Sequence, residues 1–246
     1  MQTPADPDGS PRDAPAFPAE AVEWLIDGPR RKVTSLAPAY LTAAMARAGH
    51  HLMAMPPDDT PVLDAVVASN QLPGDLDRLA TRLRSRGRFG LVCSRRDQRI
   101  PWARKLDRVL GLDQMAEPAD IAAPLLAAAR FAEVEETTYR YWQVVNHESL
   151  ELILRAELST LEPADRESRI TAALELYADY GRGVDGMQMP WVSTCYRAVV
   201  VDGIWTDGVS TGGSTTASGS TAGDSTPAEA DLFDSSSDAT LLIDFR

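Results

Sequence analysis

The chain alternates between short, almost wholly apolar runs and longer segments in which apolar residues recur at helical spacing. Two such runs are Leu63–Ala68 and Phe89–Cys93, and a helical pattern lies between them. A strand that is apolar at nearly every position must be covered on both faces, which is typical of parallel sheets with helices on either side. The sequence therefore predicts an α/β fold around a mostly parallel central sheet.

The same patterns place the individual elements. Strands are expected at Lys32–Leu36, His51–Met55, Leu63–Ala68, Phe89–Cys93, Phe131–Tyr141 and Met187–Val201. Helices are expected at residues 41–48 before Gly49, from Leu76 to Gly87, and at 102–110, 121–126, 147–158 and 170–177. We therefore expect one folded domain over residues 20–205.

Both ends of the chain differ in composition from this domain. Residues 1–19 hold five prolines and few large apolar side chains, which predicts a disordered arm. Residues 206–238 are rich in Ser, Thr, Gly and Asp, as in a flexible linker. The last segment, 239–246, is an apolar peptide that contains Leu241, Leu242, Ile243 and Phe245. We expect this peptide to add an edge strand to its own domain, beside His51–Met55, or to bind another protein.

Charge narrows the classes of function. The formal net charge is −12, and residues 198–246 carry eight acidic side chains against Arg246 alone. Because no cluster of Lys and Arg suits a phosphate backbone, we expect no nucleic-acid partner. No apolar run approaches the ~20 residues of a membrane span. The first residues lack a signal-peptide pattern and the chain has two cysteines, so we expect a cytoplasmic protein.

Four segments point to a known family. They are LDAVVASN, RGRFGLVCSRRD, IPWARKLDRVLG and MQMPWVSTCYRAVVV. Over roughly residues 21–201, their order and content resemble class I S-adenosylmethionine-dependent methyltransferases, in particular the small-molecule branch common in actinobacteria. The resemblance implies a Rossmann-like fold in which the third strand lies at the edge of the sheet.

The resemblance also implies where a cofactor would bind. The corresponding positions are Ser35, Ala37, Ala39, Pro56, Asp58 and Ser69. The family has a glycine-rich turn after the first strand, whereas Ser35–Leu41 contains no glycine, and Pro56 stands where an acid would hold the ribose. Only a few residues separate Asp59 from the next strand. The chain is therefore expected to lack the third strand and the helix before it.

These departures led us to hypothesise a degenerate methyltransferase-like protein without a cofactor. It would act by binding, either to an active methyltransferase subunit or through Leu241, Leu242, Ile243 and Phe245. Two alternatives stay open: an active S-adenosylmethionine-dependent small-molecule methyltransferase with an atypical loop, and a protein that binds another small ligand in the remodelled pocket. The sequence thus leaves open whether the protein is an enzyme.

We expect no catalytic or metal-binding role for the histidines and cysteines of the chain. His50 and His51 would point to opposite faces of a strand, so they cannot share a metal. Cys93 and Cys195 are expected as buried apolar residues. Six aromatic residues of the second half are expected either in the core or, as the resemblance implies, around the acceptor site: Trp102, Trp142, Trp191, Tyr139, Tyr141 and Tyr196.

Overall fold

The structure, a computed structural model, describes residues 17–57, 59–180 and 186–201. The chain divides into a unit of residues 1–205 and a unit of residues 206–246. The predicted linker and the C-terminal peptide lie outside the described residues, as do residues 1–16 of the predicted arm. Phe17 belongs to the core, with 5% of its surface exposed.

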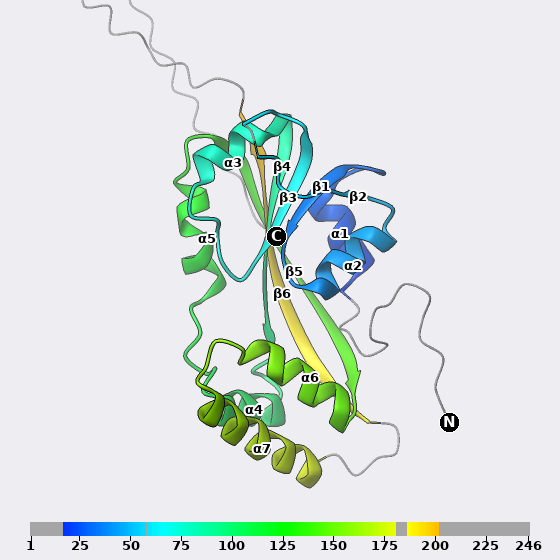
Figure 1. Cartoon of the computed structure of the whole chain (residues 1–246), viewed down its shortest axis with the longest axis vertical. Helices are drawn as coiled ribbons and strands as arrows, with labels where there is room; N and C mark the ends of the chain where they lie inside the picture. The colour runs from blue at the N-terminus through cyan, green and yellow to red at the C-terminus, as the bar shows by residue number, and fades with distance from the viewer. Residues whose placement is uncertain (1–16, 58, 181–185, 202–246) are drawn as a thin grey trace, which may run out of the picture. The chain divides into compact units, whose positions relative to one another are not determined.

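One mixed sheet of six strands organises the domain, in the order β2-β1-β3-β4-β6-β5 (Figure 1). The strands are β1 (Lys32–Leu36), β2 (His51–Leu52), β3 (Leu63–Ser69), β4 (Leu83–Arg96), β5 (Phe131–Val145) and β6 (Met187–Val200). Strands β2, β1, β3 and β4 pair in parallel, and β6 is antiparallel to both β4 and β5. The predicted α/β fold with a mostly parallel sheet is confirmed.

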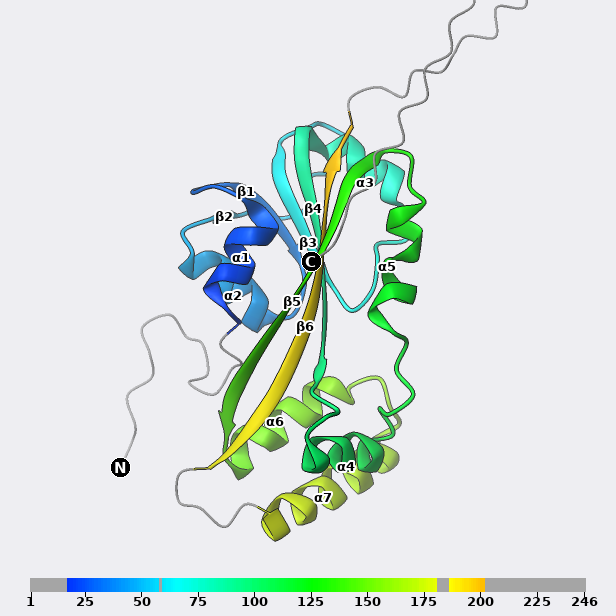
Figure 2. The same ribbon diagram turned by 180° about the vertical axis from the view of Figure 1, so that it is seen from behind.

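Seven helices occur among the described residues, in three groups (Figures 1 and 2). They are α1 (Ala19–Ile26), α2 (Ala39–Arg47), α3 (Leu76–Arg82), α4 (Pro101–Leu110), α5 (Pro118–Leu126), α6 (His147–Glu157) and α7 (Pro163–Tyr180). Helices α1 and α2 cover one face of the sheet, and α3 and α5 cover the other. Helices α4, α6 and α7 gather beside the far halves of β5 and β6 and form a third core with them.

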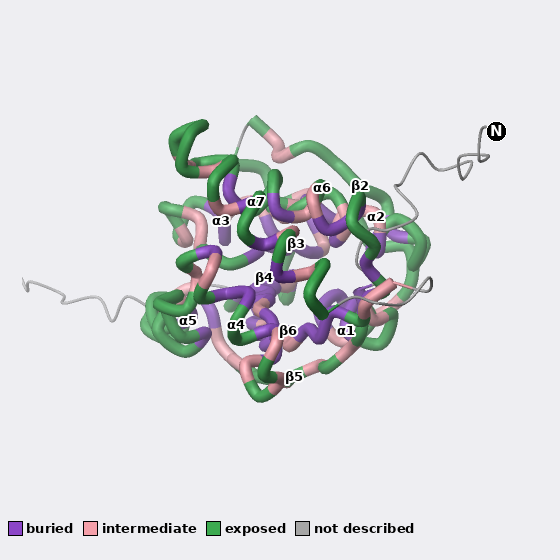
Figure 3. Tube along the Cα trace, turned by 90° about the horizontal axis from the view of Figure 1, so that it is seen from below, coloured by how far each residue is buried: buried purple, intermediate pink, exposed green. Residues whose placement is uncertain are grey.

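Strand β3 shows why the apolar runs are continuous. Val66 and Ala68 face the core under α3 and α5, whereas Ala65 and Val67 face the core under α1 and α2. Alternate side chains point to opposite faces, and here both faces are covered, so all four residues are at most 1% exposed. Figure 3 shows this buried centre between exposed helix surfaces.

The segment between β2 and β3 is short, as predicted. Apart from residue 58, which is not described, residues 53–62 contain no helix and no strand. Within the described part of the chain, β2 is therefore an edge strand, and no third-strand unit follows it. The strand is also shorter than predicted: instead of His51–Met55 it spans His51–Leu52, although the Met53 N–H still donates to the Val33 carbonyl at 2.9 Å.

The helix predicted from Leu76 to Gly87 is wrong in its second half. Helix α3 ends at Arg82, and Leu83 already begins β4 by pairing with Leu63. Leu83 fitted the helical spacing, but it is buried because it enters the sheet. The strand register then shifts, and Arg86 adopts a left-handed φ of 57°. Pairing with β3 thus overrides the local helical pattern.

Candidate functional site

A cavity of about 320 Å³ opens where the parallel strands end. Its lining comes from α2, the strand ends and α6: Pro38, Tyr40, Asn70, Ser94, Tyr141, Ile153, Ala156, Glu157 and Trp191. Strand β1 lies between β2 and β3, so the chain changes direction across the sheet between β1 and β3. Open α/β sheets bind ligands at such a switch point, outside the carboxyl ends of the strands. The position and volume of the cavity suit a small-molecule site.

The turn from β1 to α2 forms one wall and explains its lack of glycine. Pro38 has φ −56° and ψ 157°, and among the described residues of the turn none has a left-handed φ. The Ser35 hydroxyl lies 2.7 Å from the Thr42 hydroxyl, which ties the strand end to the helix. This turn therefore needs no glycine, and the cavity lies beside it, with Pro38 in the lining.

The six sequence-predicted cofactor positions are only partly brought together. Ser35 lies in β1, Ala37 in the turn after it and Ala39 at the start of α2, and Ser69 ends the neighbouring strand β3, but none of the four lines the cavity. Pro56 is half-buried after β2 and is likewise absent from the lining. Asp58 lies outside the described residues. Their roles in cofactor binding stay predictions.

Asn70, which follows Ser69, is a site residue that the sequence prediction missed. Its φ of 56° is left-handed, a conformation that Asn tolerates better than most residues. Its side-chain oxygen accepts a hydrogen bond of 2.9 Å from the Ser94 N–H and so joins the ends of β3 and β4. Strained backbone of this kind clusters at functional sites. Its signal in the sequence was an Asn directly after an apolar strand.

Hydroxyl groups line the side of the cavity nearest the sheet. The Ser94 and Ser193 hydroxyls are 2.7 Å apart, and the Tyr141 hydroxyl lies 3.3 Å from Ser193. Burial raises the pKa of Tyr141 and that of Tyr40 above their usual values, so both phenols are neutral at physiological pH. This wall therefore offers hydrogen-bonding groups and aromatic surface without charge.

The opposite wall carries a buried ion cluster. The Arg96 guanidinium is 3% exposed and binds Asp107 at 2.6 Å and also Glu157, which comes from α6. Gln98 donates a further hydrogen bond to Asp107. Burial raises the pKa of Asp107 even though Arg96 opposes the shift. Arg96 also lies over the Trp191 ring, 5.4 Å from its centroid. The cluster thus joins β4, α4 and α6 around the cavity.

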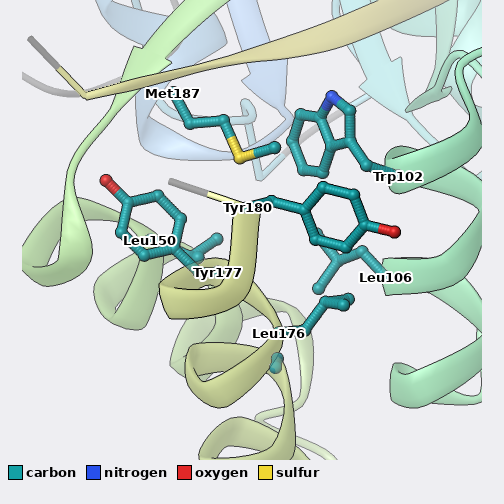
Figure 4. Close-up of a pocket in the computed structure, with 8 residues that line it drawn as sticks. Trp102, Leu106, Leu150, Leu176, Tyr177, Tyr180 and Met187 are labelled. Atoms are coloured by element: carbon teal, nitrogen blue, oxygen red, sulfur yellow. The ribbon is translucent and has the colours of Figure 1, made fainter. Parts of the chain in front are cut away.

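A second hollow is too small to hold a ligand. Its volume is about 10 Å³, and it lies among α4, α6 and α7, where Trp102, Tyr180 and Met187 face one another (Figure 4). A single water needs about this much space and polar partners. The hollow is a packing defect of an apolar core.

The six aromatic residues singled out in the sequence lie in different environments, and Trp102 lines the small hollow. Tyr141 and Trp191 line the larger cavity, whereas Tyr196 and Tyr139 pack in the sheet cores and Trp142 is 55% exposed. The acceptor role that the resemblance implied therefore suits two of the six residues, because only these two reach the cavity.

The cysteines are buried, as predicted. Cys93 and Cys195 lie on neighbouring strands but in opposite cores. Burial raises their pKa values to about 11 and about 12.

His50 is also buried, and its Nδ1 accepts a hydrogen bond from the Arg31 N–H at 3.3 Å. Over the described ranges, no group of His, Cys, Asp or Glu suits a metal ion, and no helix is long and apolar enough to cross a membrane.

Sequence comparison finds relatives that carry the name methyltransferase. An "uncharacterized methyltransferase" of Mycobacterium tuberculosis and one of Mycobacterium bovis are each 24% identical to this chain over 227 residues. The alignments cover 77% of this chain and 91% of the relative. No protein-family model matches the chain.

Solved structures with a similar arrangement are more distant in sequence. The YcgJ protein of Bacillus subtilis is 14% identical, with a TM-score of 0.37 and coverage of 75% of this chain and 99% of that one. Geranyl diphosphate methyltransferase is 13% identical, with a TM-score of 0.31 and coverage of 74% and 85%, and was solved in complex with S-adenosylmethionine.

One expectation is corrected by these comparisons. We had expected no cofactor, but similar chains were solved with S-adenosylmethionine, with sinefungin or with S-adenosylhomocysteine. The expectation rested partly on the missing glycines, and that part no longer holds because the turn without glycine leaves a cavity beside Pro38. Degeneracy stays a hypothesis. The chain is thus similar over most of its length to relatives named methyltransferases, and its sheet has the mostly parallel order expected from the resemblance.

Proposed function

We propose that the protein is an S-adenosylmethionine-dependent methyltransferase that acts on a small molecule in the strand-end cavity. This is one of the alternatives that the sequence left open. The observation that carries the proposal is the cavity itself: about 320 Å³ at the switch point of the sheet, with uncharged hydroxyls on one wall and the Glu157 carboxylate on the other.

The lining fits such a cofactor in its chemistry. S-adenosylmethionine would supply a methyl group on a positively charged sulfur. Asn70 and Ser94 provide polar groups at the strand ends, and Tyr40, Tyr141 and Trp191 provide flat surfaces against which rings can pack. The acidic wall complements the positive charge.

The residues of the chain would act mainly by orientation. Methyl transfer is an in-line displacement that depends on the alignment of the two reactants and needs little further chemistry from the protein. The bonds among Ser94, Ser193 and Tyr141 hold one wall fixed, and the bond from Glu157 to Arg96 anchors α6 over the other. The buried Trp191 and the half-buried Tyr141 keep water from part of the cavity.

Binding tests the proposal directly. S-adenosylmethionine titrated into the full chain in a calorimeter should bind with a dissociation constant of about 1 μM to 1 mM, the range of enzyme ligands. Ala156→Trp should weaken binding at least about tenfold, because Ala156 lines the cavity and a Trp there would fill it. Ala172→Trp, on the exposed surface of α7, is the matched control and should bind as the wild type does.

Transfer itself would be measured with methyl-labelled S-adenosylmethionine and a fractionated small-molecule extract. Label should appear in a small molecule, and S-adenosylhomocysteine should inhibit its appearance. A folded wild-type chain that binds no S-adenosylmethionine at 1 mM would refute the proposal.

A further inference from the structure

The charges around the cavity do not balance. Arg96 is the single cation of the buried cluster, and it faces two carboxylates, Asp107 and Glu157. The Asp107 side chain is 5% exposed and is enclosed by Arg96 and Gln98. The Glu157 side chain is 27% exposed and lines the cavity. With both carboxylates ionised the cluster carries one net negative charge, and Glu157 is its acid that reaches the cavity.

The lining itself holds no cation; Arg96, which pairs with Glu157, is not part of it. Among the nine described residues around the cavity, Glu157 is the charged one, and the others are aromatic, aliphatic or neutral polar residues. The aromatic members are Tyr40, Tyr141 and Trp191, and Arg96 already lies over the Trp191 ring, which leaves the two tyrosines as the rings without such a cation. A carboxylate beside aromatic surfaces is the environment that binds organic cations, since ring faces and the anion both attract positive charge.

We propose that Glu157 and the aromatic wall form a subsite for an organic cation, meaning a protonated or quaternary amine or a sulfonium. Two ligands of the proposed reaction could supply this group: an amine-bearing acceptor, and the sulfonium of the cofactor. The identification of the cation with an acceptor or with the cofactor rests on the proposed function. The expected preference of the cavity for a cation does not.

A charged ligand and its neutral isostere test the preference without any variant. Choline and 3,3-dimethyl-1-butanol have nearly the same shape and differ by one positive charge. Each would be titrated into the full-length wild-type chain, with tryptophan fluorescence and calorimetry as readouts. We expect choline to bind at least about tenfold more tightly. Equal affinity, or no binding of choline, would overturn the subsite for an amine.

Glu157→Gln tests the residue. It should reduce the preference for choline to within about twofold, because it removes the charge and keeps the oxygen that Arg96 binds. Glu151→Gln is the matched control: it lies on the same helix, pairs with Arg155 at 2.8 Å and does not line the cavity. An unchanged preference in Glu157→Gln would contradict the assignment. If Glu157→Gln does not fold, the wild-type comparison still decides whether the subsite exists.

A third comparison separates the two sources of the cation. S-adenosylmethionine and S-adenosylhomocysteine differ in the charge on sulfur. If the sulfonium occupies the subsite, Glu157→Gln should abolish the preference for S-adenosylmethionine, and choline should compete with it. If an acceptor amine occupies it, choline should bind to protein saturated with S-adenosylhomocysteine. If Glu157→Gln leaves the preference for the charged ligand unchanged in both pairs, choline against 3,3-dimethyl-1-butanol and S-adenosylmethionine against S-adenosylhomocysteine, the proposal is wrong. This holds whether or not methyl transfer is detected.

Discussion

Replacing Arg96 with methionine would leave a nearly buried carboxylate without its cation. Asp107, at 5% exposure, loses a bond of 2.6 Å, and Glu157, at 27% exposure, loses its anchor. Removing one partner of a buried pair typically destabilises a protein by about 3–5 kcal/mol. Since Glu157 reaches solvent, we expect the lower end, about 3 kcal/mol, which lowers the melting temperature by roughly 6–12 °C in a domain of this size.

The loss should depend on pH in a defined direction. The pKa of Asp107 is already raised by burial, so its charge opposes folding above its folded pKa and stops doing so below its unfolded pKa. Without Arg96, which lowers this pKa, the folded pKa rises further. The difference in unfolding free energy between wild type and Arg96→Met should therefore be largest near pH 7.5 and shrink towards pH 5.

Urea unfolding followed by tryptophan fluorescence, at both pH values, gives these differences. Arg78→Met is the matched control: its side chain is 57% exposed and pairs at 3.2 Å with Asp59, whose side chain is 52% exposed, so water can solvate the remaining carboxylate and stability should change little. Arg96→Met with Asp107→Leu should recover at least half of the loss, since no buried charge is left there. A loss below about 1 kcal/mol at pH 7.5, or an equal loss at pH 5, would refute the reasoning.

Three further predictions concern burial, backbone strain and helix capping. Cys93 and Cys195 should react with a thiol reagent at pH 7.5 only after unfolding, because burial raises their pKa values to about 11 and about 12; rapid labelling of the folded chain, relative to the urea-unfolded control, would contradict this. Asn70→Ala should destabilise the chain more than Asn70→Gly in thermal unfolding, because both lose the bond to the Ser94 N–H but only Ala is strained at φ 56°, by roughly 1 kcal/mol; equal melting temperatures would show that the strain is absent. Asn146→Ala should lower the unfolding free energy by about 1 kcal/mol in urea, because it removes the capping box of α6, whereas Asn146→Asp should restore most of it; an unchanged midpoint in Asn146→Ala would argue against the cap.

The fold was largely predictable because its signals are local. Continuous apolar strands, helical spacing and stop glycines each act over a few residues, and the short segment between β2 and β3 leaves no room for another strand. The prediction failed at Leu83. A helix and a strand would both bury this side chain, and only its pairing with Leu63 decides in favour of the strand.

The candidate site was far less predictable. The resemblance pointed to Ser35, Ala37, Ala39 and Ser69. Three of these are sequence neighbours of residues that line the cavity, but the lining itself is made by Pro38, Tyr40, Asn70 and residues of later elements. A motif marks where the chain turns, but side-chain direction depends on the length and dihedral angles of the turn. Here the turn holds no residue with a left-handed φ, and Pro38 and Tyr40, not Ala37 or Ala39, reach the lining.

The sequence by itself determined the parallel sheet, the covered β3 and the missing third-strand unit, because each follows from neighbouring residues and from chain length. Only the tertiary structure decided that a cavity remains beside Pro38 and that the Glu157 carboxylate lines it. Arg96 and Glu157 are 61 residues apart, and a contact over that distance depends on how α6 folds back over the sheet. No local pattern encodes such a contact, because its free energy arises only when both groups leave water together.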